Sequence, residues 1–322
     1  MSEIESRWSA EDLERITSEG LTVEEVEREV ALFQRGVTPI RLVRPCHEGD
    51  GIDVIPAAEQ ESLLGLYEKA LAAKRCLKFV PASGAASRMF KEWYRWLDEG
   101  GISDKAQGDA FAGDLKRYCL FSDLRAFFAA QQRDLEELLD KKDHATILRG
   151  ILTDRGLNYG GLPKALLKFH AYPEGCRTPL EEHLVEAALY ARCAGNTSRL
   201  HFTVSSEHQN AVRSHLQQVI GTYQSRLETV FEVGLSIQST GTNTLAVDME
   251  KRPFRDESGG LVFRPGGHGS LLANLNDLDA DIIFLKNIDN CVPDHLKPET
   301  VRWKKILAGF LITLQDGIFE RL

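Results

Sequence analysis

The spacing of apolar residues predicts helices in the first part of the chain. After Thr22, which forms a capping-box pattern with Glu25, apolar residues recur every three or four positions, as on one face of a helix. A further helix is predicted around residues 57–74, after an irregular stretch rich in proline and glycine. We therefore expect residues 1–75 to form a helical N-terminal segment.

The apolar pattern changes at Leu77, where a buried strand is predicted. Leu77, Phe79 and Val80 stand close together, as in a strand that is covered on both faces. Helical spacing then returns and continues over residues 92–158. We interpret this block as a helical insertion in one domain that extends over residues 76–322.

Beyond the helical block, short apolar strands alternate with helices. The predicted strands are LLKFHAY, RLHFTVS, VFEVGLSIQ and DIIFLKNID, and a two-strand excursion, TLAVD with LVFR, precedes the last of them. This succession is typical of βα units that build a mainly parallel sheet with helices on its faces. The sequence therefore predicts an α/β fold.

Composition and charge narrow the classes of partner. With 43% hydrophobic and 27% charged residues among 322, the chain can bury the core of one large or two modest domains. Its formal net charge of −9 argues against a broad basic surface, so we expect no nucleic-acid partner and only local phosphate binding. There is no apolar leader and no apolar run near ~18 residues, so we expect a cytoplasmic protein without a membrane partner. The six cysteines include no CxxC pair, which argues against a zinc ribbon and a disulfide scaffold.

The stretch FVPASGAASRMFK continues the strand predicted at Leu77 into a run of small residues. Ser83, Gly84 and Ala85 would let backbone N–H groups approach a ligand closely, and the start of a following helix attracts anions. Arg88 adds a positive charge beside them. Two interpretations stay open, a phosphate-binding turn and a tight strand-to-helix turn without a ligand. The P-loop pattern GxxxxGK[ST] and the dinucleotide pattern GxGxxG are both absent.

Residues 82–88 resemble the first signature of sugar-nucleotide pyrophosphorylases, members of the GT-A-like nucleotidyltransferase superfamily. That signature is a small-residue turn after a strand, ending in Gly-Thr-Arg, and here Ala86 stands where glycine is expected. The later Pro-Lys of the signature is matched by Pro163 and Lys164, although the spacing from Arg88 is far longer than usual. The resemblance implies a GT-A/Rossmann-like core in which the helical block is inserted between the two halves of the signature.

A third match lies in RPGGHGSLLANLNDLDADIIFLKNIDN, which resembles UDP-sugar pyrophosphorylases. In that family a Gly-Gly-His-Gly turn contacts the nucleotide, and an Asn-Ile-Asp-Asn strand end carries a metal-binding aspartate, here Asp289. The resemblance implies Mg²⁺ bound through Asp289. The whole chain also looks like an uncharacterised bacterial family of unknown function. The nucleotide-binding residues that the resemblance implies are Ser83, Gly84, Ala85, Gln238, Gly266, Gly267, His268 and Gly269.

The resemblance implies a nucleotidyltransferase. A nucleotidyl group, expected to be uridylyl, would move from a nucleoside triphosphate (NTP), expected to be UTP, to a sugar 1-phosphate, with release of pyrophosphate. Arg88 and Lys164 would be catalytic, because this reaction requires positioning and charge neutralisation more than covalent help. We expect Gly84, Arg88, Lys164, Gly267 and Asp289 to line one cleft at the carboxyl ends of strands.

Two alternatives remain open. A catalytically inactive nucleotide-binding sensor or scaffold with the same fold is favoured by Ala86, by the long insertion and by the lack of a recognisable second metal carboxylate. A glycosyltransferase would use the same core without needing the two cations. The missing carboxylate and an end without a helix stop signal indicate a truncated chain. We expect His183 to be a packing or surface residue and His201 and His208 to be structural, because no Cys or carboxylate spacing supports a zinc site.

Overall fold

The chain folds into two compact units. The structure, a computed structural model, describes residues 7–322 except 74, 85, 87 and 265, and it leaves out the side chain of His268. The smaller unit consists of the residues up to Gln60 together with Gln238–Leu278, and the larger unit of Glu61–Ile237 together with Asp279–Leu322. This division differs from the expected one after residue 75, because contacts between distant segments define the units and the local pattern does not show them.

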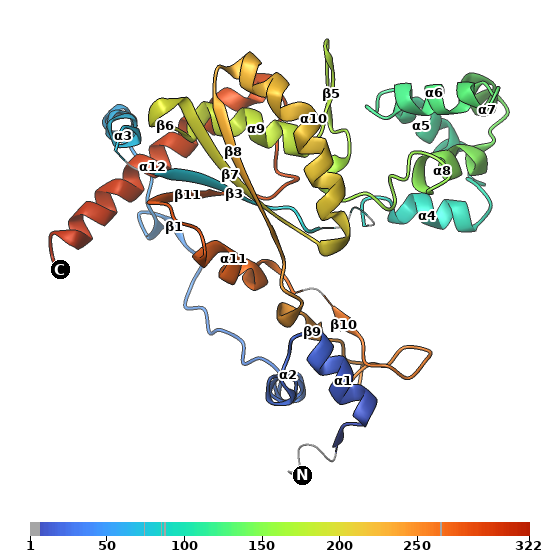
Figure 1. The fold of residues 1–322 in the computed structure, drawn as a ribbon, viewed down its shortest axis with the longest axis horizontal. Coiled ribbons are helices and arrows are strands. Elements are labelled where there is room, and N and C mark those ends of the chain that lie inside the picture. Colours follow the sequence, from blue (N-terminus) through green and yellow to red (C-terminus); the bar gives the residue numbers. More distant parts are fainter. Residues whose placement is uncertain (1–6, 74, 85, 87, 265) are drawn as a thin grey trace. The chain divides into compact units, whose positions relative to one another are not determined.

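The fold is mixed α/β (Figure 1). Its α-helices are α1 (Ala10–Ser18), α2 (Val23–Arg35), α3 (Ala57–Leu71), α4 (Lys91–Asp98), α5 (Lys105–Leu115), α6 (Phe121–Ala130), α7 (Leu135–Asp140), α8 (His144–Leu152), α9 (Pro179–Tyr190), α10 (Gln209–Leu227), α11 (Leu272–Asn276) and α12 (Lys297–Phe319). Its strands are β1 (His47–Glu48), β2 (Gly51–Ile52), β3 (Cys76–Pro81), β4 (His170–Tyr172), β5 (Gly175–Arg177), β6 (Arg192–Cys193), β7 (Thr197–Val204), β8 (Val230–Ile237), β9 (Thr244–Leu245), β10 (Phe263–Arg264) and β11 (Ile282–Leu285). Short 3₁₀ helices are η2 (Lys164–Leu166), η3 (Ala194–Asn196), η4 (Ser206–His208), η5 (Thr240–Thr242), η6 (His268–Leu271) and η7 (Asp294–Leu296).

Four parallel strands form the centre of the larger unit, in the order β11, β3, β7, β8. Phe79 of β3 lies opposite Leu285 of β11 on one side and His201 of β7 on the other. The short strand β6 pairs antiparallel with the beginning of β7. Every residue of β3 is buried, as expected for a central parallel strand. The carboxyl ends of β3 and β11 therefore meet at the same edge of the sheet.

The predicted strand LLKFHAY is wrong as a member of this sheet. Its first residue, Leu166, is the last of η2, and β4 pairs antiparallel with β5 in a separate two-stranded hairpin. The intervening Pro173 and Glu174 form the turn that folds the segment back on itself. A short apolar run followed by Pro and Gly looks the same in sequence whether it ends a sheet strand or opens a hairpin.

Helices α9 and α10 pack on one side of the sheet (Figure 1). Thr178 begins α9 with a capping box to Glu181, and Pro179 occupies its first turn. The apolar core beneath them is formed by residues of β3, β7, α9 and α10, among them Val80, Leu184, Phe202 and Leu216. Almost every residue of α9 is buried, so its polar side chains must find partners inside the protein.

Residues between β3 and η2 are helical, as the pattern predicted, and pack around a core of their own. Helices α4 to α8 bury a cluster of leucine, isoleucine and aromatic side chains that includes Phe111, Leu124, Phe128 and Ile147. We call this group the helical lobe. Its core also takes in Ala86, which lies within the first candidate signature segment, and Leu167, three residues after Lys164.

In the smaller unit, α1 and α2 pack with the β9–β10 hairpin around Ile16, Val26, Val30 and Leu245. The capping box expected at Thr22 is present, since its hydroxyl accepts from the backbone of Glu25 and the Glu25 carboxylate accepts from the backbone of Thr22. The antiparallel pair expected in the excursion before DIIFLKNID is confirmed by β9 and β10. Across all the residues that the structure describes, no helix has the length and apolar character required to cross a membrane.

Candidate functional site

Lys164 and Asp289, which lie far apart in the sequence, meet in the larger unit. The Lys164 ammonium donates to Asp289 Oδ2 at 2.5 Å, and the two side chains are 22% and 35% exposed. The Lys164 backbone N–H donates to the carbonyl of Gly84 at 3.4 Å. Three predicted site residues from three separate sequence segments are therefore brought together, and partial exposure leaves the ion pair accessible to a ligand.

The parallel pairing of β3 and β11 explains why Asp289 reaches this place. Beyond the end of β11, the backbone of Lys286 donates to the carbonyl of Phe79 and that of Ile288 donates to the carbonyl of Pro81, both at 3.2 Å. These bonds continue the ladder to the last residue of β3. Asp289 therefore lies beside the start of the small-residue turn, at the sheet edge where α/β proteins bind ligands.

The small-residue turn after β3 is open around Gly84. Gly84 is exposed, and a Cβ added there would meet no described atom within 4 Å. Packing against the described residues therefore does not explain the glycine, which leaves close approach of a ligand as a reason for it. Arg88 is exposed and forms no hydrogen bond or ion pair with any residue that the structure describes. Ser83 is half-buried, and Ala85 lies outside the described residues.

Ala86 replaces the glycine that the resemblance implies, and the structure gives a packing reason. Its side chain is completely buried and belongs to the apolar core of the helical lobe. Helix α4 begins at Lys91, with Phe90 as a cap that makes no side-chain hydrogen bond. Arg88 thus stands in a turn before the helix, not on its first turn.

The segment that carries Asp289 is held from α9 by two buried polar contacts. The ring of His183, which is fully buried, donates from Nε2 to the carbonyl of Ile288 at 3.1 Å. Three residues further along α9, the Glu186 carboxylate binds Lys286 Nζ at 2.6 Å and Lys78 Nζ at 2.8 Å. Asp289 therefore follows a backbone that is fixed on the inner side by a histidine and an ion pair.

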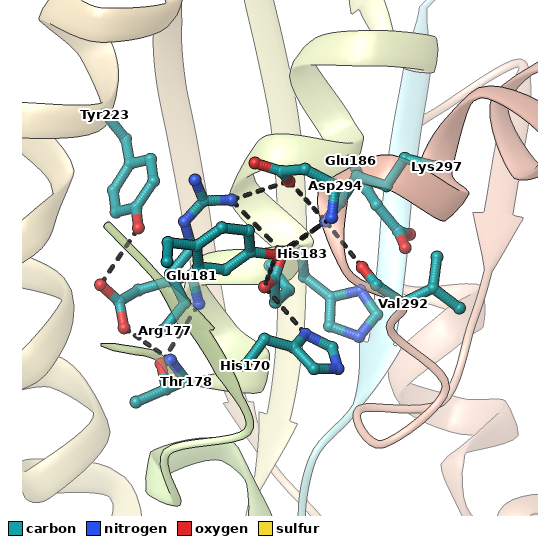
Figure 2. A network of polar contacts seen from close by, with 12 residues as sticks. His170, Arg177, Thr178, Glu181, His183, Glu186, Tyr223, Val292, Asp294 and Lys297 are labelled. Carbon is teal, nitrogen blue, oxygen red and sulfur yellow. Dashed lines mark hydrogen bonds and ion pairs between the residues drawn. The ribbon is translucent and has the colours of Figure 1, made fainter. Parts of the chain in front are cut away.

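The chain beyond this segment is tied to Glu182, the residue before His183. The buried Glu182 carboxylate accepts from Lys297 Nζ at 2.5 Å and from the Tyr172 hydroxyl at 2.6 Å, and it binds His170 Nδ1 at 2.9 Å. Figure 2 shows Arg177 and Lys297 converging on this cluster, where Arg177 pairs with Asp294 at 2.8 Å. We call Glu182, His183 and Glu186, with their partners, the α9 clamp.

Burial and neighbouring charges shift the pKa values of three clamp residues. Burial alone would raise the pKa of Glu186, but the charges of Lys78 and Lys286 lower it to about 2. Burial, together with the charge of Lys78, holds the pKa of His183 well below its usual value, so the ring is neutral. Burial lowers the pKa of Lys78 to about 7 against the opposing attraction of Glu186. The neutral His183 ring leaves its buried Nδ1 without a hydrogen-bond partner among the described residues.

A second group of predicted residues meets inside the smaller unit. Gln238 donates from Nε2 to the carbonyl of Gly266 at 3.3 Å and to Ser270 Oγ at 2.8 Å. Only glycine fits at 266, because a Cβ would lie 2.5 Å from the carbonyl oxygen of Thr242. Gly267 caps η6, which contains the backbone of His268 together with Gly269. The amide of Gln238 thus organises the glycine-rich turn.

The two groups belong to different units, and each is described by itself. Gly84, Arg88, Lys164 and Asp289 are in the larger unit, and Gln238 with the Gly266–Gly269 turn is in the smaller. Their convergence in one cleft, and the ligand contacts assigned to them, stay predictions. The imidazole of His268 lies outside the described side chains.

Asp289 could supply one ligand to a metal ion, but the described residues around it do not form a complete metal site. Within the described chain, no cluster of three His, Cys, Asp or Glu residues could hold an ion, and Asp289 Oδ2 is engaged by Lys164. A site made of protein ligands alone does not fit. Mg²⁺ is commonly bound by one or two carboxylates with water and substrate phosphates, so a single aspartate fits an ion that arrives with a nucleotide.

Sequence interpretation missed the α9 clamp. Lys78 is fully buried within an apolar strand. His183 is buried, as a packing residue would be, and it also bonds to the backbone of the Asp289 segment. The available signal was the occurrence of Glu181, Glu182, His183 and Glu186 on a helix that is otherwise apolar. His201 binds Ser236 Oγ at 2.8 Å across β7 and β8, in keeping with a structural role.

The chain was also compared with known protein families and structures. The family described as "Domain of unknown function (DUF4301)" matches residues 9–322. No curated protein matches the chain. Among solved structures, the chain is similar to the uridine diphosphate N-acetylglucosamine pyrophosphorylase from Trypanosoma brucei, solved in complex with an inhibitor, at 13% identity and a TM-score of 0.41. That match covers 80% of this chain and 39% of the solved chain.

Proposed function

This chain belongs to the DUF4301 family, whose description names no activity, and we therefore propose a function from the site itself. The function is transfer of a nucleotidyl group, uridylyl in the first instance, from an NTP to a sugar 1-phosphate on a GT-A-like core. The observation that carries it is the meeting of Lys164, Asp289 and the Gly84 carbonyl at the carboxyl edge of β3 and β11. These residues come from the three signature segments in their expected order.

The reaction would require charge neutralisation more than covalent catalysis. An oxygen of the sugar phosphate would attack the α-phosphorus, the bond to the bridging oxygen would break, and pyrophosphate would leave. Lys164 would exchange its bond to Asp289 for a phosphate oxygen, and the exposed Arg88 would meet the charge that develops in transfer. When bound, Mg²⁺ would use an oxygen of Asp289 together with phosphate oxygens and neutralise part of the triphosphate charge.

The residues of the smaller unit would contribute to recognition of the nucleotide. The Gly266 turn is fixed from within by Gln238 and Ser270, so its backbone groups are preorganised before a ligand arrives. We assign Gln238 mainly to this support, because its Nε2 is engaged by the turn. Contact with the base would then come from the turn itself.

A screen for pyrophosphate release tests the proposal. The full chain would be incubated with Mg²⁺, each of the four common NTPs and a panel of sugar 1-phosphates. We expect release that requires both substrates and is lost on removal of Mg²⁺ with a chelator. Absence of release with every pair would contradict the proposed function.

A catalytically inactive nucleotide-binding protein is the second candidate. The favouring observation is that Lys164 is neutralised by Asp289, while the described residues contain no metal-binding cluster. Binding of a uridine nucleotide in calorimetry without turnover in the screen would select this candidate.

A further inference from the structure

A pocket lined by aromatic side chains lies where the helical lobe joins the Lys164 segment. Its volume is about 400 Å³, within the range of small-molecule sites. The walls come from α4 and the residue before it, from the chain between α5 and α6, and from the residues on either side of η2. The lining side chains that matter here are Phe90, Trp93, Tyr118, Tyr159, Phe169 and Lys168.

The aromatic rings form walls at different angles. Trp93 lies 5.4 Å from Phe90 and 6.0 Å from Tyr118 between ring centroids, with interplanar angles of 47° and 41°. Phe90 and Tyr159 are both 7% exposed, whereas Tyr118 is 43% exposed. The inner rings are thus fixed by packing, and Tyr118 stands at the mouth. Such a pocket can enclose a flat or chair-shaped ring between faces that need not move.

Polar groups at the same pocket can form hydrogen bonds with the hydroxyl groups of a ligand. Lys168, which lines it, pairs with Asp123 at 2.5 Å, and both side chains are 36% exposed. An ammonium next to a carboxylate offers both a donor and an acceptor. The combination of aromatic walls with a few polar groups at the margin is what a sugar ring requires, because its C–H faces are apolar and its periphery carries hydroxyls.

Two walls of the pocket continue directly from the candidate catalytic segments. Met89 and Phe90 follow Arg88 in the chain. Leu167 donates its N–H to the carbonyl of Lys164 at 3.4 Å in the turn of η2, so the lining begins about 6 Å along the chain axis from Lys164. The pocket wall therefore begins within three residues of both candidate catalytic cations along the chain.

We propose that this pocket binds the ring of a phosphorylated sugar acceptor, so that the helical lobe supplies acceptor specificity. The inference rests on the proposed function for the identity of the second substrate, but ring binding is measurable without turnover. It gives the inserted helices a role that the signature segments do not provide. Tyr118 is the best residue to test, because its exposure makes a change there compatible with folding.

The experiment is calorimetric titration of the full chain, with and without a non-hydrolysable UTP analogue. The probes are glucose 1-phosphate, N-acetylglucosamine 1-phosphate, the ring-free glycerol 3-phosphate and inorganic phosphate. We expect at least one hexose phosphate to bind roughly tenfold more tightly than glycerol 3-phosphate, and Tyr118→Ala to remove most of that preference. Phe254→Ala is the matched control, since Phe254 is 44% exposed but lies outside the pocket, and it should leave binding unchanged.

The outcomes separate this proposal from the proposed function. Equal binding of hexose phosphates and glycerol 3-phosphate, or unchanged hexose binding in Tyr118→Ala, would overturn the pocket assignment. Ring-selective binding without pyrophosphate release for any NTP would retain the pocket and reject nucleotidyl transfer. If the protein releases pyrophosphate and Tyr118→Ala leaves the KM for the sugar phosphate unchanged, nucleotidyl transfer is retained and the pocket assignment is rejected.

Discussion

The two chain segments that meet at the carboxyl edge of β3 and β11 are built in opposite ways. The Asp289 segment is tied to α9 through buried contacts of His183 and Glu186. The turn after β3 carries an exposed glycine and an exposed Arg88 that binds no residue the structure describes. One side of the candidate site is fixed by the protein, and the other offers a ligand a positive charge that no described residue pairs with.

This difference separates residues that hold the site in position from residues that would bind the substrate. Buried ion pairs are often no better for stability than apolar side chains of similar volume, because both charges lose their water. Their retention around α9 is explained if they set the position of the Asp289 backbone. Arg88 needs no such support when phosphate oxygens are its partners. The clamp should therefore govern stability, and the turn should govern activity.

The largest effect on stability is expected from Glu186→Gln. This change leaves Lys78 without its carboxylate in a fully buried position, which should cost about 3–5 kcal/mol in the free energy of unfolding. Urea denaturation measures it. The control is Glu68→Gln, which removes an exposed partner of Lys305 and should cost less than about 1 kcal/mol. Equal effects of the two substitutions would show that the clamp carries no special stability.

Acid should weaken the protein through the same carboxylate. The pKa of Glu186 is lowered from 4.5 to about 2 in the folded protein, so its contribution is complete above pH 4.5 and is lost as the pH falls toward 2. The loss should be on the order of 3 kcal/mol, from the difference between the two pKa values. Urea denaturation at several pH values, compared with Glu186→Gln, isolates it. Parallel pH profiles for the two proteins would contradict the assignment.

Arg88→Ala should have the opposite character. Loss of one preorganised positive charge should lower kcat by roughly 10²-fold, equivalent to about 2.7 kcal/mol. The free energy of unfolding should change by less than about 0.5 kcal/mol, because Arg88 is exposed and binds no described residue. Pyrophosphate release and urea denaturation on one preparation measure both. If Arg88→Ala lowered stability and left turnover unchanged, the turn would contribute to stability and not to catalysis, which contradicts the prediction.

The smallest effect is expected from Gly84→Ala. A Cβ would meet no described atom within 4 Å, so the free energy of unfolding should stay within about 0.5 kcal/mol. If phosphates approach the backbone there, the methyl group should raise the KM for the NTP by roughly tenfold. Gly113→Ala in α5, where a Cβ also meets nothing, serves as the control and should leave the KM unchanged. An unchanged KM in Gly84→Ala would remove the phosphate role of the turn.

The sequence predicted the elements that local chemistry determines. The strand at Leu77 and its small-residue turn are visible in residue type and spacing, and the meeting of Lys164 with Asp289 was expected from the order of the motifs. The polar residues of α9 are visible in the sequence, but their pairing was not predictable, because Glu186 and Lys78 are separated by more than a hundred positions and nothing local marks them as partners. The LLKFHAY error has the same origin, since three apolar residues can begin a hairpin or a sheet strand.

The most direct test of the central claim is a double-mutant cycle on Lys164 and Asp289, measured by single-turnover pyrophosphate release at several Mg²⁺ concentrations. Lys164→Met and Asp289→Asn should each slow transfer by roughly 10²-fold, and the double variant should be little slower than either, because both act on the same phosphates. Asp289→Asn should also need more Mg²⁺ for half-maximal rate. Unaltered transfer in both single variants of an active protein would contradict the catalytic role of this ion pair.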